Sequence, residues 1–441
     1  MPQGTPQSAS AAEPTIDLGL SLQVGKYDIQ KMLGKGSTGT VYLAKDQFTG
    51  KEVALKTIEP EVFRDPDFGA VYRAQFQNEA SLAGKLRHPH IIAILDAVVG
   101  EDFGHIAMEL VTGGDLSQYV KPERLLPPAD VLQIGFKVCG AMDYAYRERG
   151  IVHRDIKPAN IMLAHGTEIR IADFGAAFLK KSQVAQSAAM GSPFYMAPEQ
   201  LEGRDATFHS DMYSLGVVLY ELLTGRRPFA ADKLENLVQH ILHTSPPPPS
   251  ALRPGLPREI DAVVLRAMKR DPAQRYGTWA QFGVELSRAM TLVMPASAIP
   301  DSEKYLALSK VEMLQLLSDA EFWELAAAGL WSRVPKGKAI VKEDAPGASF
   351  FFLAKGQAKV TKQGRLLNMI NEGECFGEMA FIRGGEEPRH ATVEAMTEAV
   401  VAEYEAETLE RMSLAAQLHL TRALVRNTVE RLALANTRIA R

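Results

Sequence analysis

The sequence predicts an α+β chain in which two strand-rich regions flank a helical one. Residues 27–57 have a strand-like pattern interrupted by glycine turns. Apolar residues at helical spacing follow, first at 69–87 and then at 128–149. Strand-like segments return near the end of the chain, at 336–343, 349–353 and 356–360. Their shortness and their turn residues indicate a small β-barrel or jelly roll.

Size and composition are ordinary for a globular protein. The chain has 441 residues, of which 46% are hydrophobic and 23% charged, so roughly two or three domains are expected. The net charge of −4 argues against nucleic acid as the main partner. The cysteines, Cys139 and Cys375, indicate neither a disulfide framework nor a zinc site, so we expect a reducing, cytoplasmic environment. We expect residues 1–25 to be a disordered tail, and we expect no membrane insertion.

The stretch with the densest chemistry is Val152–Asn160. It holds an acid, a lysine and an amide, namely Asp155, Lys157 and Asn160, and the triplet Asp173-Phe174-Gly175 follows it. In this order the groups suit phosphoryl transfer. A carboxylate orients a hydroxyl, a cation neutralises the moving phosphate, and Asn and Asp oxygens hold magnesium.

A glycine-rich segment, Leu33–Val41, lies between two strand-like runs, where glycines let backbone N–H groups approach a triphosphate. A GxGxxG pattern alone also fits a hairpin turn or a dinucleotide site. A dinucleotide fingerprint opens a helix, however, whereas Val41–Ala44 continues as a strand. Lys56, in the next strand, is then suited to the α- and β-phosphates, and its alternative is a solvated lysine at a strand edge.

Together these segments resemble the protein kinase family, and we expect a kinase domain at 26–288. The resemblance implies a two-lobed fold, ATP and Mg²⁺. It implies that Asp155 orients and deprotonates the acceptor hydroxyl, that Lys157 neutralises the γ-phosphate, and that Glu79 locks Lys56. The implied contacts with ATP and metal are Leu33, Gly34, Gly36, Gly39, Val41, Ala54, Lys56, Met108, Glu109, Val111, Asn160 and Asp173, the last two holding Mg²⁺.

The resemblance also extends to specificity and adenine binding. Glu109 and Val111 would pair with adenine through backbone atoms, and Met108 would control access to a back pocket. Lys157 and the segment Gly191-Ser192-Pro193 are typical of the serine/threonine branch rather than the tyrosine branch.

Supporting residues follow from the same resemblance. Asp211 would brace the backbone near His153, and Arg275 would pair with Glu199. Arg154 would bind a phosphate on the activation loop, carried by Ser182 or Ser187.

The C-terminal region, expected at 310–441 after a linker at 289–309, resembles the cyclic-nucleotide-binding domain. That domain needs a carboxylate for the ribose 2′-OH and an arginine for the cyclic phosphate. Glu378 and Arg389 match these places, although the gap between them is slightly longer than the family pattern. The implied nucleotide contacts, with cyclic AMP or cyclic GMP as ligand, are Gly377, Glu378, Arg389 and Ala391.

Two features of this region have alternative interpretations. Glu378 and Arg389 could pair with each other in a barrel that binds no nucleotide and serves for dimerisation or docking. The helical tail from Ser413 to Arg441 could form a homodimer or cover the nucleotide pocket. Its apolar residues recur every seven positions, at Leu418, Val425, Leu432 and Ile439.

The sequence therefore predicts a kinase that transfers the γ-phosphate of ATP to Ser and Thr hydroxyls of proteins, with a C-terminal cyclic-nucleotide sensor. The rivals are an active kinase with a barrel that binds no nucleotide, and a non-catalytic scaffold.

Overall fold

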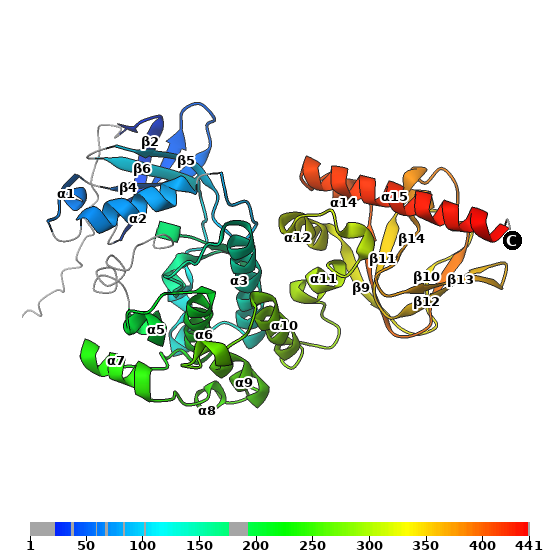
Figure 1. The fold of residues 1–441 in the computed structure, drawn as a ribbon. Coiled ribbons are helices and arrows are strands. Elements are labelled where there is room, and N and C mark those ends of the chain that lie inside the picture. The colour runs from blue at the N-terminus through cyan, green and yellow to red at the C-terminus, as the bar shows by residue number, and fades with distance from the viewer. Residues whose placement is uncertain are drawn as a thin grey trace, which may run out of the picture.

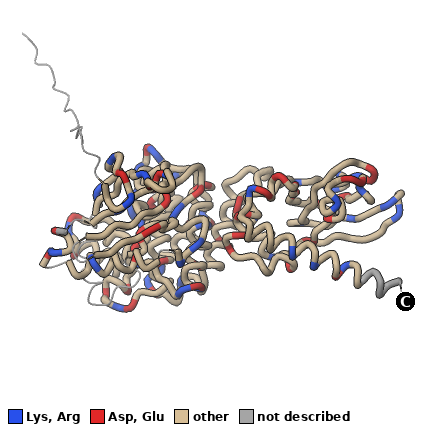
Figure 2. The backbone as a smooth tube through the Cα atoms, turned by 90° about the horizontal axis from the view of Figure 1, so that it is seen from above, with Lys and Arg blue, Asp and Glu red and all other residues tan. Residues whose placement is uncertain are grey.

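The structure, a computed structural model, describes residues 23–36, 39–58, 60–66, 69–82, 84–100, 103–175 and 193–439. Figure 1 shows an N-terminal body with a sheet-rich lobe and a helical lobe, and a C-terminal body that contains a barrel. The α+β prediction, with a two-lobed fold followed by a small jelly roll, is confirmed. Basic and acidic residues are interspersed along both bodies (Figure 2).

The first lobe is built on an antiparallel sheet with the strand order β1-β2-β3-β4-β6-β5. Its strands are β1 (Gln23–Val24), β2 (Tyr27–Gly36), β3 (Gly39–Asp46), β4 (Glu52–Ile58), β5 (Ile94–Val99) and β6 (Gly104–Glu109). Helices α1 (Pro60–Phe63) and α2 (Gly69–Ser81) accompany the sheet. Helix α2 ends before the expected residue 87, because the amides of Leu82 and Lys85 bond to carbonyls three residues back and Gly84 turns the chain at φ +68°.

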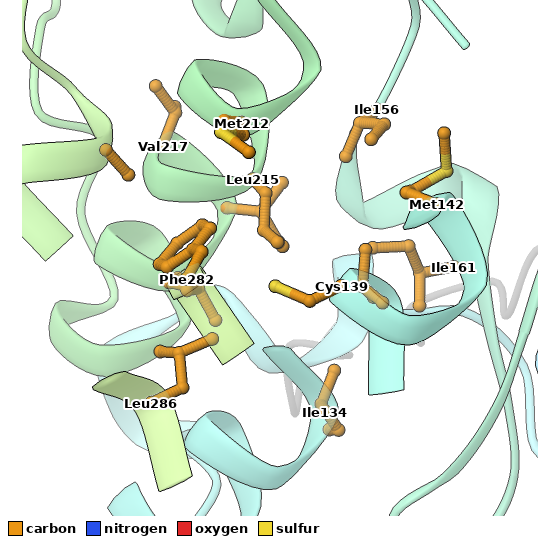
Figure 3. Close-up of a cluster of buried hydrophobic side chains, with 14 of the residues drawn as sticks. Ile134, Cys139, Met142, Ile156, Ile161, Met212, Leu215, Val217, Phe282 and Leu286 are labelled. Atoms are coloured by element: carbon orange, nitrogen blue, oxygen red, sulfur yellow. The ribbon is translucent and has the colours of Figure 1, made fainter. Parts of the chain in front are cut away.

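The second lobe is mainly helical. Its elements are η1 (Leu116–Tyr119), η2 (Pro122–Arg124), α3 (Pro128–Arg149), η3 (Pro158–Asn160), β7 (Ile161–His165), β8 (Glu168–Ile171), η5 (Pro193–Tyr195), α5 (Pro198–Leu201), α6 (Phe208–Thr224), α7 (Leu234–His243), α8 (Pro249–Leu252), α9 (Arg258–Ala267), η6 (Pro272–Gln274) and α10 (Trp279–Met290). Helices α3, α6 and α10 share one core, in which Cys139, Leu215 and Phe282 point toward one another (Figure 3). Helix α6 is mostly apolar and is buried on every side, together with its acidic residues Asp211 and Glu221, so it forms the centre of the lobe.

Two helices open the C-terminal body. The residue pattern predicts one helical stretch from Tyr305 to Leu330, whereas the structure has α11 (Asp301–Leu308), η7 (Glu312–Leu314) and α12 (Asp319–Ala328). Ser318 explains the second start, because its hydroxyl accepts from the Glu321 amide while the Glu321 carboxylate accepts from the Ser318 amide. Helix α11 therefore lies inside the stretch expected to be a linker.

The barrel consists of two four-stranded sheets, ordered β14-β11-β16-β9 and β10-β15-β12-β13. Its strands are β9 (Leu330–Val334), β10 (Ala339–Val341), β11 (Phe350–Lys355), β12 (Gln357–Lys362), β13 (Arg365–Asn371), β14 (Cys375–Phe376), β15 (Thr392–Ala395) and β16 (Ala399–Tyr404). Strand β11 is apolar from Phe350 to Ala354, so both of its faces can be buried, and it ends at the exposed Lys355. Phe351 and Leu353 face the second sheet, whereas Phe350 and Phe352 pack with the helices.

Helices α13 (Glu378–Ile382), α14 (Ala406–Leu409) and α15 (Leu414–Ile439) complete the C-terminal body. Helix α15 runs along the barrel, with its N-terminal end near α12 (Figure 1). Among the described residues, none of the helices is both long enough and apolar enough to cross a membrane.

Candidate active site

A cleft of about 780 Å³ lies between the two lobes of the N-terminal body. Residues from β2, β3, β4 and β6 line one side, and the segment 159–162 and Asp173 line the other. Of the expected ATP contacts, Gly36 alone is not in this lining. The cleft brings together Leu33, Gly34, Gly39, Val41, Ala54, Lys56, Met108, Glu109, Val111, Asn160 and Asp173.

The hairpin between β2 and β3 requires glycine at one position. At Gly39, with φ +146°, a Cβ atom would lie 2.1 Å from the carbonyl oxygen of Thr57. A side chain would therefore push β3 away from β4, which carries Lys56. The absence of a side chain at Gly39 therefore lets the β2–β3 hairpin lie close to β4.

A buried ion-pair network joins three elements at the back of the cleft. The Nζ atom of Lys56 lies 2.7 Å from Oε2 of Glu79 and 3.4 Å from Oδ1 of Asp173. Burial opposes the charge of Lys56, but the carboxylates of Asp173 and Glu79 outweigh it and hold the Lys56 pKa above its ordinary value. Burial raises the pKa of Glu79. The sequence-predicted partnership of Lys56 and Glu79 is present.

The catalytic stretch forms a second cluster around Asp155. Its Oδ2 accepts from Nζ of Lys157 at 2.7 Å and from Nδ2 of Asn160 at 3.0 Å. The same Asn160 nitrogen donates to the Asp155 carbonyl at 2.8 Å, so the amide oxygen of Asn160 is the atom left to hold a cation. Carboxylate and amide oxygens fit Mg²⁺, and Asp173 lies at the end of the same strand pair as Asn160.

Asp211 of α6 fixes the backbone of the catalytic stretch, Val152–Asn160. Its carboxylate accepts from the amides of His153 at 2.7 Å and Arg154 at 2.8 Å, so the predicted bracing is confirmed. Burial raises the pKa of Asp211 to about 6. Arg154 has a left-handed backbone, at φ +68°, which is strain that this bracing helps to maintain, and Asp173 has a left-handed backbone as well, at φ +63°.

The predicted pair of Glu199 and Arg275 is also confirmed. Nη1 of Arg275 lies 2.7 Å from Oε1 of Glu199, and Nη2 lies 2.8 Å from Oε2, in a buried two-pronged contact. The activation-loop residues Ser182, Ser187 and Ser192 lie outside the described residues.

In the barrel, the longer gap before Arg389 does not carry this residue away from α13. The turn at Gly384 and Gly385 returns the chain, and a Cβ atom at Gly377 would lie 3.1 Å from Nη1 of Arg389. Arg389 is buried, and Nη1 and Nη2 donate to the carbonyl and hydroxyl of Ser349 at 2.6 and 2.9 Å. Burial lowers the pKa of Arg389, which reflects the cost of keeping its charge there.

Glu378 and Arg389 do not form the mutual pair that was one alternative. Glu378 is buried, and its Oε1 lies 2.8 Å from Nη1 of Arg431 on α15, while Nη2 of Arg431 donates to the Cys375 carbonyl at 2.5 Å. Ala391, the remaining expected contact, is partly buried just before β15. Sequence reasoning missed both Arg431 and Ser349, because neither belongs to a short motif.

These features define a two-lobed protein kinase fold followed by a separate β-barrel domain. The chain belongs to the protein kinase domain family, whose match covers residues 27–283. A second match, to the cyclic nucleotide-binding domain family, covers residues 331–415.

Curated relatives agree with the first match. Serine/threonine-protein kinase PknB of Mycobacterium tuberculosis H37Rv is 35% identical over 303 residues, which are 67% of this chain and 46% of that protein. Serine/threonine-protein kinase PrkC of Bacillus subtilis is 35% identical over 267 residues, 60% of this chain and 40% of that protein. The probable serine/threonine-protein kinase SCO3848 of Streptomyces coelicolor is 36% identical over 276 residues, again 60% and 40%. The chain thus spans less than half the length of these relatives.

Proposed function

We propose that this chain is an ATP- and Mg²⁺-dependent serine/threonine protein kinase whose C-terminal domain binds a cyclic nucleotide. The kinase activity in this proposal rests on one observation, which is that two clusters of charged and polar side chains lie at the same cleft. The Lys56–Glu79–Asp173 network and the Asp155–Lys157–Asn160 cluster contain the charged and polar groups that phosphoryl transfer requires.

ATP binds with its adenine at the end of β6 and its phosphates toward Lys56. The backbone of Glu109 and Val111 pairs with the adenine, and Met108 limits the depth of the pocket. Because Glu79 fixes the ammonium of Lys56, the α- and β-phosphates meet a cation that is already positioned. Such preorganised charge stabilises the transition state without a reorganisation cost.

Asp155 accepts the proton of the acceptor hydroxyl, and Lys157 neutralises the transferred phosphate. The Asn160 oxygen and the Asp173 carboxylate would hold Mg²⁺, which would supply positive charge to the phosphates during transfer. Lys157, two residues after Asp155, favours Ser and Thr acceptors, and the relatives reported above are named serine/threonine-protein kinases.

A phosphoryl-transfer assay with radiolabelled ATP and a generic protein acceptor tests the kinase proposal. Asp155→Asn keeps the shape of the side chain and removes the proton acceptor, so transfer should fall by at least about 10²-fold. Equal transfer by wild type and variant, or no transfer by either, would favour the scaffold alternative.

For the barrel, the supporting observation is the buried charge of Arg389. The hydrogen bonds of its guanidinium go to Ser349 and Gly377, which are neutral groups, and the nearby carboxylate of Glu403 accepts from the Ser349 hydroxyl rather than from Arg389. A buried cation of this kind is stabilised by an anion, and a cyclic phosphate supplies one. Glu378 would then receive the ribose 2′-OH. Calorimetry with cyclic AMP and cyclic GMP tests this, with Arg389→Ala as the control that should lose binding.

A homodimer through α15 is a further part of the proposal. One face of the helix is buried against the barrel, with Ala416, Leu420 and Leu424. The other face exposes apolar side chains, at Leu414, Leu418, Val425, Val429 and Leu432. A second copy of α15 would cover this stripe. Light scattering of wild type and Val425→Glu tests it, since only the wild type should be dimeric.

A further inference from the structure

The two bodies meet at a joint centred on Trp323 of α12. Its side chain is buried at 6% exposure, and its ring lies edge-on to that of His90 at 4.6 Å and stacks on that of Tyr305 at 4.5 Å. On the kinase side, Phe136 of α3 contacts the same ring at 5.9 Å. Charged pairs on either side of this ring cluster also join α3 to the C-terminal body, namely Lys137–Asp301 and Arg147–Asp319.

His90 connects this joint to the active site through the backbone. The amide of Ile171 donates to the His90 carbonyl at 2.8 Å, and the amide of Ile92 donates to the Ile171 carbonyl at 2.9 Å. Ile171 ends β8 and is two residues before Asp173, while the amide of Ala172 bonds to the Asn160 carbonyl at 2.9 Å. A displacement of His90 therefore acts directly on the strand that positions both metal-binding candidates.

On its other side, α12 is tied to α15. Oε1 of Glu321 lies 2.9 Å from Nδ1 of His419, and Oε2 of Glu324 accepts from the Ser413 amide at 2.6 Å. Further along α15, Nη1 of Arg431 lies 2.8 Å from Oε1 of Glu378, the residue proposed to receive the ribose hydroxyl. Helix α15 thus contacts both Glu378 of α13 and α12, and Figure 1 shows its N-terminal end near α12.

The joint also contains buried polar atoms with no hydrogen-bond partner in the described chain. They are Nε1 of Trp323 and Nε2 of His88, whereas Nδ1 of His90 has Oε2 of Glu168 at 3.8 Å. Burying such groups without hydrogen-bond partners costs free energy. The packing of the aromatic rings must outweigh this cost for α12 to stay docked. Because these two contributions to the free energy partly cancel, a small change in free energy at the Glu378 end of the C-terminal body can undock α12.

We propose that α12 is the element through which the C-terminal domain controls the kinase, with Arg431 as its anchor at the nucleotide pocket. Arg431 holds the carboxylate that a ribose hydroxyl would take, so ligand and Arg431 compete for Glu378. The Lys56–Glu79 pair is assembled in the structure in which α12 is docked, so the proposal assigns the docked arrangement as the active one. A ligand that displaces Arg431 from Glu378 should therefore lower the phosphoryl-transfer rate, as the loss of Arg431 does. The inference rests on the proposed kinase activity and on no particular ligand.

The test uses the full chain without nucleotide and compares wild type, Trp323→Leu, Arg431→Gln and the double variant. Each single substitution should lower the phosphoryl-transfer rate by about fivefold or more, which is typical of coupling between sites. The double variant should be no slower than the slower single variant, because both changes interrupt one route. Arg426→Gln is the matched control, since Arg426 lies on α15 and pairs only locally with Glu430 at 2.9 Å.

Amide hydrogen exchange provides the second readout. The amides of Ile92 and Ile171 should exchange faster in Trp323→Leu and in Arg431→Gln, but not in Arg426→Gln. Asp319→Asn, which breaks a polar contact of the same joint, should show the same change if Trp323→Leu fails to fold. Exchange is measurable whether or not the protein transfers phosphate, so an inactive wild type would count against the proposed function alone.

The proposal is overturned if the joint variants keep wild-type exchange at Ile92 and Ile171. It is also overturned if the effects of Trp323→Leu and Arg431→Gln on the rate multiply, because independent effects exclude a shared route. A rate increase in Trp323→Leu would contradict the assignment of the docked arrangement as the active one.

Discussion

The Nζ atom of Lys56 lies 2.7 Å from the Oε2 atom of Glu79, with both side chains buried. This single contact joins strand β4 to helix α2 at the back of the cleft. Its second carboxylate neighbour, Asp173, belongs to the other lobe. The ammonium group of Lys56 can therefore contact both carboxylates only when the two lobes lie close together, which is the arrangement that phosphate binding requires.

Removing either charge of this network should abolish phosphoryl transfer without unfolding the protein. We expect Lys56→Met and Asp173→Ala each to lower the transfer rate by about 10²-fold or more, since these charges act in the transition state. Initial rates and circular dichroism check this together. Lys45→Met is the matched control because Lys45 is exposed on the neighbouring strand β3. A near-wild-type rate in either site variant would refute the assignment.

The buried pair of Glu199 and Arg275 should matter for stability rather than for chemistry. Arg275→Met leaves the Glu199 carboxylate buried without its partner, which typically costs about 3–5 kcal/mol. Arg288→Met breaks an exposed pair with Glu285 and should change the free energy of unfolding by less than about 1 kcal/mol. Denaturant unfolding measures both. Equal effects of the two substitutions would show that burial of the pair contributes nothing.

Asp211 gives the kinase body a pH-dependent stability. Burial raises its pKa from 3.8 to about 6, although His153 and the amides of His153 and Arg154 favour its charged form. Between about pH 4 and pH 6 the native protein binds more protons than the unfolded chain, so this carboxyl makes the protein less stable as pH rises.

Asp211→Asn removes that titration. Relative to wild type, its free energy of unfolding should improve by roughly 3 kcal/mol from about pH 4 to about pH 7, from a shift of roughly two pKa units. Unfolding curves at several pH values provide the measurement. A difference between the two proteins that does not change with pH would contradict the raised pKa.

Sequence motifs located the kinase residues well because each functional group sits at a fixed offset from its neighbours. Lys56, Asp155, Asn160 and Asp173 are each embedded in such a motif, and the structure gathers them around one cleft. Their roles in transfer remain predictions. Glu79 has no motif of its own, and the family resemblance alone pointed to it.

The contacts of the C-terminal body were harder to predict. The seven-residue apolar repeat shows which face of α15 is apolar, but it says nothing of where Arg431 reaches, since Glu378 is distant in sequence. The break between α11 and α12 was missed, although Ser318 followed by Glu321 is a capping-box signal. The docking of Trp323 on His90 depends on the relative placement of two domains, which no local pattern encodes.

The most direct test of the account is the phosphoryl-transfer rate of the full chain measured against the concentration of cyclic AMP and cyclic GMP, for wild type and Arg389→Ala. Losing the arginine of a buried charge pair costs about 2–5 kcal/mol, or roughly two orders of magnitude in affinity. We predict a saturable change in the wild-type rate with at least one nucleotide, shifted to concentrations about 10²-fold higher in Arg389→Ala. A wild-type rate that stays constant up to millimolar nucleotide would contradict the account and leave the barrel as a docking module.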